Sequence, residues 1–214
     1  MSKNNSLGLV LVLCAPMALA GTLTLNCNGV ISNSSSSNSC MQGLASADGG
    51  IGGPGNESVG AFASGLTFAS ASYVTDLVID FTGGTGAGFY VPCLDAQNGG
   101  TGEASAGLGS VIYQATPFVG GACGLYTMFS GEIPIPFVFG VPQVQGLDLS
   151  AQAGAGGSGS AQFSGGFIVL DANRNVIPGV SASIQEAPEP APASTVLCGL
   201  ALALIARRFL VCSS

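Results

Sequence analysis

The sequence VQGLDLSAQAGAGGSGSAQFSGGFIVLD, residues 144–171, contains two runs of alternating apolar and polar side chains, joined by the glycine-rich segment GAGGSG. Alternation with a period of two places the apolar residues of a strand on one face. We therefore expect residues 144–153 and 160–171 to form a β-hairpin with a mobile tip. The apolar side chains that should face one another are Leu147, Leu149, Ala151, Phe163, Phe167 and Val169.

Similar alternation recurs along the chain in short runs separated by glycine-rich turns. The runs predict strands at residues 22–27, 59–64, 66–71, 73–81, 89–93, 109–115, 125–129, 132–142 and 180–184. Pro134, Pro136 and Pro142 fall on one face of the run 132–142, which places that strand at a sheet edge or a crossover because proline cannot donate to a ladder. The segments SNSSSSNSC, residues 32–40, and DAQNGGTGEASAG, residues 95–107, are expected to be surface loops.

The composition favours β structure over long helices. Apolar residues make up 47% of the chain, and 34 glycines disfavour extended helix. Together with the strand pattern, this predicts an all-β fold, an antiparallel β-sandwich that is jelly-roll-like. A parallel β-helix is the alternative, given the glycine and asparagine content.

Both ends of the chain differ from the middle. At the start, Lys3 precedes an apolar run at residues 7–15, and Ala18 and Ala20 form a small-x-small cleavage site. At the end, the triplet Pro188, Glu189 and Pro190 precedes a charge-free apolar run at residues 196–206, which Arg207 and Arg208 close. That run is shorter than the roughly 20 residues of a stable membrane span, so it suits a temporary anchor with the arginines on the cytoplasmic side.

The order of triplet, apolar run and basic pair resembles the PEP-CTERM sorting signal of bacteria, which exosortases recognise. The resemblance is confined to the C-terminal tail. It implies an exported protein that meets the secretion translocase, signal peptidase and exosortase, is held transiently in the inner membrane, and reaches the cell surface or medium. We expect a signal-peptide helix at residues 1–20, a secreted β-domain at 21–185, a proline-rich linker at 186–194, and a hydrophobic helix with a basic tail at 195–214.

The cysteine content agrees with export. Cys27, Cys40, Cys93 and Cys123 lie in the expected secreted domain, and an even number of cysteines in an exported domain predicts disulfides. Four cysteines allow three pairings, of which we favour the nearest neighbours, Cys27–Cys40 and Cys93–Cys123. Zinc is not expected, because the chain has no C-x-x-C pair and no histidine.

The residue types exclude several classes of function. The net charge is −7 and Arg174 is the only basic residue between residues 21 and 187, so nucleic-acid binding is not expected. Without histidine, and with its only lysine in the expected signal peptide, the chain offers no familiar nucleophile–base pair. Asp76 and Asp80 share a strand face about 13 Å apart, too far for paired-carboxylate hydrolysis. We therefore expect no enzyme activity and no cofactor.

The sequence contains two weaker signals of binding. The segments 95–98 and 171–175 could offer oxygen ligands to Ca²⁺, although turns stabilised by Asx side chains explain both. Exposed aromatic residues could stack on sugar rings, and the candidates are Tyr73, Tyr90, Tyr113 and Tyr126.

The leading functional hypothesis is a surface or extracellular-matrix protein with a structural or adhesive role. The resemblance of the tail links such proteins to exopolysaccharide and biofilm. The alternative is a carbohydrate-binding β-sandwich module.

Overall fold

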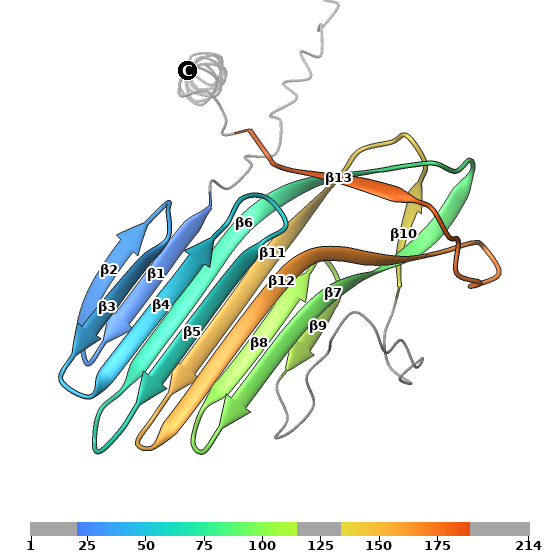
Figure 1. Ribbon diagram of the computed structural model, residues 1–214. Coiled ribbons are helices and arrows are strands. Elements are labelled where there is room, and N and C mark those ends of the chain that lie inside the picture. Colours follow the sequence, from blue (N-terminus) through green and yellow to red (C-terminus); the bar gives the residue numbers. More distant parts are fainter. Residues whose placement is uncertain (1–20, 115–133, 189–214) are drawn as a thin grey trace, which may run out of the picture. The chain divides into compact units, whose positions relative to one another are not determined.

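The computed structural model describes residues 21–114 and 134–188, and this part of the chain consists of strands and turns (Figure 1). Its strands are β1 (Thr22–Cys27), β2 (Val30–Ser34), β3 (Asn38–Gln42), β4 (Ala45–Ile51), β5 (Glu57–Ala63), β6 (Ala69–Thr82), β7 (Ala87–Gly99), β8 (Glu103–Leu108), β9 (Val111–Gln114), β10 (Ile135–Val138), β11 (Gln143–Ala153), β12 (Gly157–Leu170) and β13 (Ser181–Glu186). The expected terminal helices and the expected strand at 125–129 lie outside the described residues. Among the described residues, no helix is long and apolar enough to cross a membrane.

The strands form two antiparallel sheets that pack face to face. One sheet has the order β2-β1-β6-β11-β8-β9, with β13 also paired to β6, and the other has the order β10-β7-β12-β5-β4-β3. Strands β5, β12 and β7 of one sheet face their sequence neighbours β6, β11 and β8 of the other. This order of β5 to β12, with four strands in each sheet, is that of a jelly roll. The expected antiparallel sandwich is confirmed, and the alternative β-helix is wrong because all strand pairs of the described residues are antiparallel.

The first four strands extend both sheets at one end of the jelly roll. Strands β1 and β2 continue one sheet beyond β6, and β4 and β3 continue the other beyond β5. A disulfide between Cys27 of β1 and Cys40 of β3 therefore joins the two sheets covalently. Strand β13 lies on the same edge of β6 as β1, because β1 pairs with residues 69–74 and β13 with residues 77–82 while β11 occupies the other edge.

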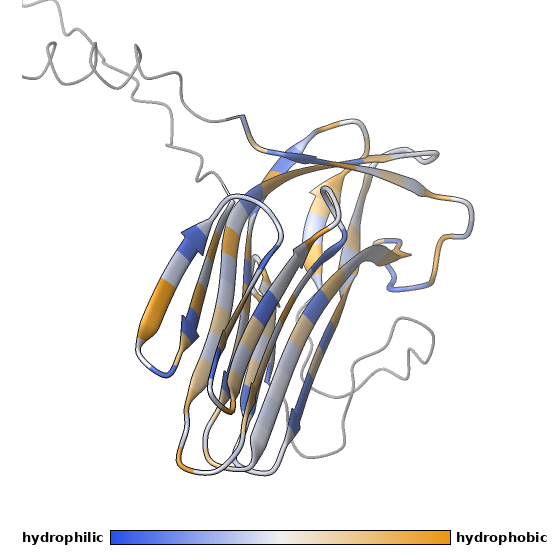
Figure 2. Ribbon diagram, turned by 60° about the vertical axis from the view of Figure 1, so that its left-hand side comes forward, coloured by the Kyte–Doolittle hydropathy of each residue, from blue (hydrophilic) through white to orange (hydrophobic). Residues whose placement is uncertain are grey.

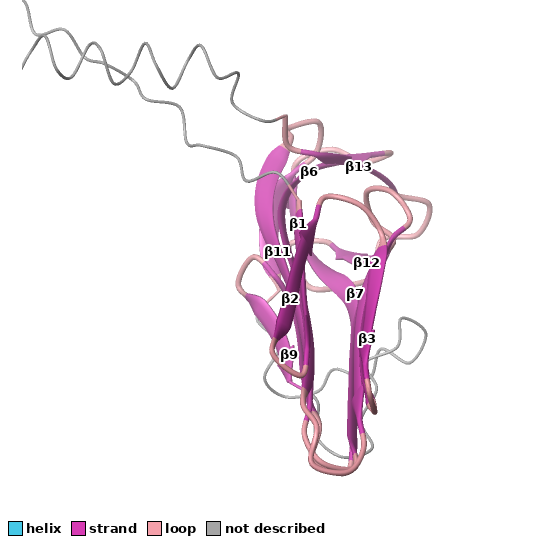
Figure 3. Ribbon diagram, turned by 90° about the vertical axis from the view of Figure 1, so that its left-hand side faces the viewer, coloured by secondary structure: helices cyan, strands magenta, loops and turns pink. Residues whose placement is uncertain are grey.

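The core is filled unevenly along the strands. Every second residue along most of the strands is buried, and the colours of Figure 2 mark hydrophobic and hydrophilic positions along the same strands. One half of the core is lined by alanine: Ala45, Ala47, Ala61, Ala63, Ala69, Ala71, Ala96, Ala104, Ala106, Ala151, Ala153 and Ala161. The other half holds an aromatic cluster in which the ring of Phe81 lies 4.5 Å from Phe137 and 4.9 Å from Tyr90 between centroids. The sheets accordingly lie closer together at the alanine end than at the aromatic end (Figure 3).

The predicted hairpin at residues 144–171 is wrong. Strands β11 and β12 belong to different sheets, and the turn between them, closed by a hydrogen bond from the Gly157 amide to the Gly154 carbonyl at 2.9 Å, carries the chain from one sheet to the other. Leu147 and Leu149 are buried on the inner face of one sheet, and Phe163 is buried on the inner face of the other. They therefore face each other's sheet across the core rather than lying side by side in one sheet. The alternation correctly predicts which side chains are buried, and it contains no information about which strands pair.

Three other expectations are corrected. The expected loop at 32–40 contains parts of β2 and β3, and the expected loop at 95–107 contains the end of β7 and most of β8. In both segments the inward side chains are small, so the alternation is easily missed: Ala96, Ala104 and Ala106 are buried. The expected strands at 66–71 and 73–81 are one strand, β6. By contrast, β10 lies at the end of its sheet with Pro136 in its ladder, as an edge strand should.

Candidate functional site

Few of the expected processing residues lie in the described part of the chain. Ala18, Ala20, Glu189, Pro190, Arg207 and Arg208 are outside it. Pro188 is described and is exposed. The residue before it, Ala187, is buried and donates its amide to the carbonyl of Asp76 at 2.9 Å, so the β-domain holds the chain up to that point.

The cysteine prediction is confirmed for one pair. Cys27 and Cys40 form a disulfide. Cys93 is also disulfide-bonded, while Cys123, its expected partner, lies outside the described residues. Disulfides are typical of proteins that fold outside the reducing cytoplasm.

The carboxylates singled out in the sequence do not form a site. Asp76 and Asp80 lie half-buried on the outer face of β6, and neither lines the polar groove or the apolar hollow described below. Asp171 accepts hydrogen bonds from the backbone amides of Asn173 and Asn175, both at 2.8 Å, which is the expected Asx turn. The bonds from Asn175, backbone first, lower the pKa of the Asp171 carboxyl. No cluster of three metal-ligating acids or cysteines occurs within residues 21–114 and 134–188.

The expectation that exposed tyrosines could stack on sugar rings is wrong for Tyr73 and Tyr90. Tyr73 and Tyr90 are 1% and 0% exposed, because both point into the sandwich on the same face as their apolar neighbours. Tyr126 lies outside the residues that the structure describes, as does the side chain of Tyr113. Two aromatic side chains of the described residues do face solvent: Phe68, which is 42% exposed before β6, and Phe62, which is 53% exposed on the outer face of β5.

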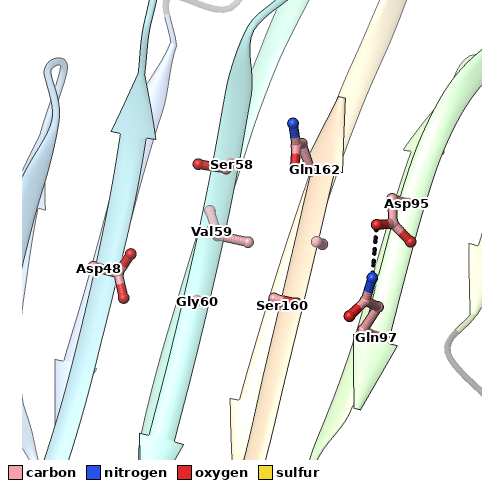
Figure 4. A pocket seen from close by; sticks show the side chains of 9 residues that line it. Asp48, Ser58, Val59, Gly60, Asp95, Gln97, Ser160 and Gln162 are labelled. Atoms are coloured by element: carbon pink, nitrogen blue, oxygen red, sulfur yellow. Dashed lines mark hydrogen bonds between the residues drawn. The ribbon is translucent and has the colours of Figure 1, made fainter. Parts of the chain in front are cut away.

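A polar groove of about 420 Å³ crosses the outer face of the sheet that contains Phe62 (Figure 4). Its floor is formed by β4, β5, β12 and β7, whose residues Asp48, Gly60, Ser160 and Gln97 lie opposite one another in a row. A second row, one residue pair further along the strands, contains Ser58, Gln162 and Asp95. The lining is thus a set of carboxylate, carboxamide and hydroxyl groups on rigid strands.

The groove owes its depth to Gly60. A Cβ atom at this position would lie 3.0 Å from Oδ1 of Asp48, so a larger residue would crowd the carboxylate and fill the floor. On the far wall, Nε2 of Gln97 donates to Oδ2 of Asp95 at 2.9 Å, which fixes both side chains (Figure 4). The groove therefore has preset polar groups before any ligand arrives.

Phe62 stands directly beside this groove. It follows Gly60 by two residues on β5 and so points to the same side of the sheet, about 7 Å further along the strand. Its neighbours in the ladder are Ser46 and Ser158, which leave its ring uncovered. An exposed ring next to hydrogen-bonding groups is the usual arrangement for binding a molecule with both an apolar face and hydroxyl edges.

A second feature, which the sequence analysis missed, is a buried carboxyl group between the sheets. Glu57 of β5 is 1% exposed, and its Oε1 accepts the amide of Gly55 at 2.8 Å. Burial is the main cause that raises the pKa of Glu57 to about 7, and the charge of Glu186 raises it further. The strand predicted here began at Val59, and extending its alternation back by two residues would have placed Glu57 on the buried face.

The surroundings of Glu57 link it to the C-terminal strand. Tyr73 of β6 donates its hydroxyl to Oε1 of Glu186 on β13 at 3.2 Å. Burial, followed by the charge of Glu186, raises the pKa of the Tyr73 hydroxyl to about 12. The hydrogen bond from Tyr73 to Glu186 thus holds β13 on the sandwich.

A shallower, mainly apolar hollow of about 460 Å³ lies near β10. It is lined by Ala87, Gly88, Phe89, Pro136, Phe137, Val138, Gln143 and Ala172. It contains no titratable side chain, so the polar groove is the better candidate site.

Comparison of the chain with protein-family models, with curated proteins and with solved structures gives no match.

Proposed function

We propose that this chain is an exported bacterial surface or matrix protein whose jelly-roll domain adheres to exopolysaccharide through the polar groove beside Phe62. The export part of the proposal is supported by the signal-peptide pattern, by the tail that resembles a PEP-CTERM signal, and by the Cys27–Cys40 disulfide. The adhesive part combines the structural and carbohydrate-binding hypotheses.

The observation that carries the adhesive role is the combination of Phe62 with the two polar rows. A sugar ring has an apolar face that stacks on an aromatic ring, and hydroxyl groups at its edge that donate to carboxylates and exchange hydrogen bonds with carboxamides. The outer face of this sheet supplies both kinds of partner, because the polar groups lie on β4, β5, β7 and β12 and the ring of Phe62 stands about 7 Å along β5 from Gly60. The two polar rows run across the strands. A linear chain of sugars that follows a row would therefore lie perpendicular to the strands.

The negative charge of the domain limits which polysaccharides can bind in the groove. Asp48 and Asp95 line the groove, and the described residues contain a single basic side chain, that of Arg174. An anionic polymer would be repelled at this surface. We therefore expect the ligand to be a neutral polysaccharide, and we expect no catalytic turnover of it.

The binding proposal is tested by electrophoresis of the full chain through gels that contain neutral or anionic polysaccharides. A neutral polymer should retard the protein, and Phe62→Ala should weaken the retardation about tenfold, as expected for loss of one stacked ring. The control is Val144→Ala, because Val144 is 60% exposed on the outer face of the other sheet. The proposal fails if neutral polymers do not retard the protein, or if the two variants behave alike.

The sorting proposal is tested by the intact mass of the protein recovered from the cell surface and medium of its native host. Loss of both ends, near Ala20 and near Pro188, would support processing by signal peptidase and exosortase. A chain that keeps its tail in both fractions would refute the sorting proposal without affecting the groove.

A further inference from the structure

The two sheets end together in a pair of open edge strands, β2 and β3 (Figure 3). Within the described residues, β2 pairs only with β1, and β3 pairs only with β4, so each has one side of its backbone without a partner strand. The two edges belong to different sheets but are close, since Nδ2 of Asn38 on β3 donates to Oγ of Ser32 on β2 at 3.1 Å. The Cys27–Cys40 disulfide also ties β3 to β1, the strand with which β2 pairs.

This end of the sandwich lacks the features that normally prevent edge strands from associating. Natural edges are protected by charged side chains, proline or bulges. Residues 21–47 contain no charged residue and no proline, although the chain as a whole has a net charge of −7. Exposed apolar side chains gather here instead: Val30 at 53%, Ile31 at 64% and Met41 at 78% exposure.

The opposite end of the sandwich is different. Its edge strands are β9 and β10, and β10 contains Pro136, which has no amide to donate to an added strand. An arrangement that joins unlike ends of two copies would therefore meet a protected edge. Two β2–β3 ends can join without that obstacle.

We propose that the β2–β3 edge is a self-association surface at which two copies of this chain form a two-fold symmetric dimer. A two-fold axis perpendicular to the sheets makes β2 antiparallel to β2 of the second copy, and in the same step makes β3 antiparallel to its own counterpart. Both sheets then continue from one copy into the other. A second copy fits better than an unrelated partner, because this uncharged edge is the part of an acidic molecule at which two copies do not repel each other.

The surface predicts a specific pattern of variants. Ile31→Lys places two positive charges near each other across the axis and blocks the edge, so it should raise the dimer dissociation constant at least about tenfold. The matched control is Ile112→Lys, because Ile112 is 67% exposed on β9, the strand at the opposite end of the same sheet. Met41→Lys tests the second edge strand independently of the first.

The experiment is sedimentation velocity of the full chain, over a concentration series, for the wild type and the three variants. Circular dichroism and thermal melting establish that each variant is folded. Dimers in the wild type and in Ile112→Lys, with monomers in Ile31→Lys and Met41→Lys, would support the proposal. A monomeric wild type, or a dimer that Ile31→Lys leaves intact, would overturn it. The control also separates association at this edge from association through the hydrophobic ends of the chain, which all variants share.

Discussion

Replacement of the buried Glu57 by glutamine should change the pH dependence of stability in a defined direction. Its pKa is about 7 in the folded protein, against 4.5 for an ordinary glutamate. A carboxyl whose pKa is raised by folding contributes most below its unfolded pKa, and this contribution is lost as the pH rises through the folded pKa. Glu57 should therefore lower the free energy of unfolding progressively between pH 4.5 and pH 7.

The size of this effect follows from the two pKa values. One pKa unit corresponds to about 1.4 kcal/mol, so a shift from 4.5 to about 7 corresponds to about 3 kcal/mol. Glutamine keeps the shape and can accept the same amide hydrogen bond from Gly55, but it carries no charge. At pH 8 the Glu57→Gln variant should thus be more stable than the wild type by up to about 3 kcal/mol, and near pH 4.5 the two should be alike.

The assay is urea unfolding of wild type and variant at a series of pH values, with the difference between the two taken at each pH. Taking the difference removes the contributions of the other carboxyl groups, which both proteins share. Glu103→Gln serves as the control, because Glu103 is exposed on β8. A difference between wild type and Glu57→Gln that stays constant from pH 4.5 to pH 8 would refute the assignment of Glu57 as a buried carboxyl that loses its proton near neutral pH.

Two other predictions concern the alanine-lined half of the sandwich. Replacing both Cys27 and Cys40 by alanine should lower the free energy of unfolding by about 3 kcal/mol, because the disulfide closes a loop with a sequence separation of 13; an unchanged urea midpoint would contradict the role of this link between the sheets. Gly102→Ala should destabilise the fold by more than about 2 kcal/mol, because its Cβ would overlap the carbonyl of Ser158. Gly146→Ala is the control for that comparison, since its nearest contact would be an ordinary 3.6 Å, and equal melting temperatures of the two glycine variants would contradict the prediction.

The sequence predicts the burial of side chains better than the pairing of strands. Alternation identified Leu23 and Leu25 of β1, and Leu77 and Ile79 of β6, as inward residues, and all four are buried. The same alternation suggested a hairpin between β11 and β12, which are in different sheets. A buried apolar face has the same pattern whether its strand pairs with the next strand or faces it across the core, so this distinction depends on the whole sheet order.

The candidate site was harder to predict than the buried residues. It depends on the order of four strands in one sheet, and part of one of them does not have a clear strand pattern in the sequence. Asp48, Asp95 and Gln97 come together only when β4 and β7 are placed on either side of β5 and β12. The part of β7 that carries two of them was expected to be a loop, since its inward residue Ala96 is small. Phe62, however, had a usable signal: it lies between two inward alanines, so its ring must point outward.

The proposed groove and the proposed dimer reinforce each other geometrically. A two-fold axis perpendicular to the sheets leaves the two grooves, one from each copy, on the same side of the dimer. The row that contains Asp48 and Gly60 runs across the strands and reaches Ser39 on β3, the edge at which the second copy would begin. One long polysaccharide could then contact two grooves in succession, and the second contact would be intramolecular, which raises the overall affinity without any new kind of contact. The uncharged edge and the polar face would together suit a protein that adheres to a repetitive polymer.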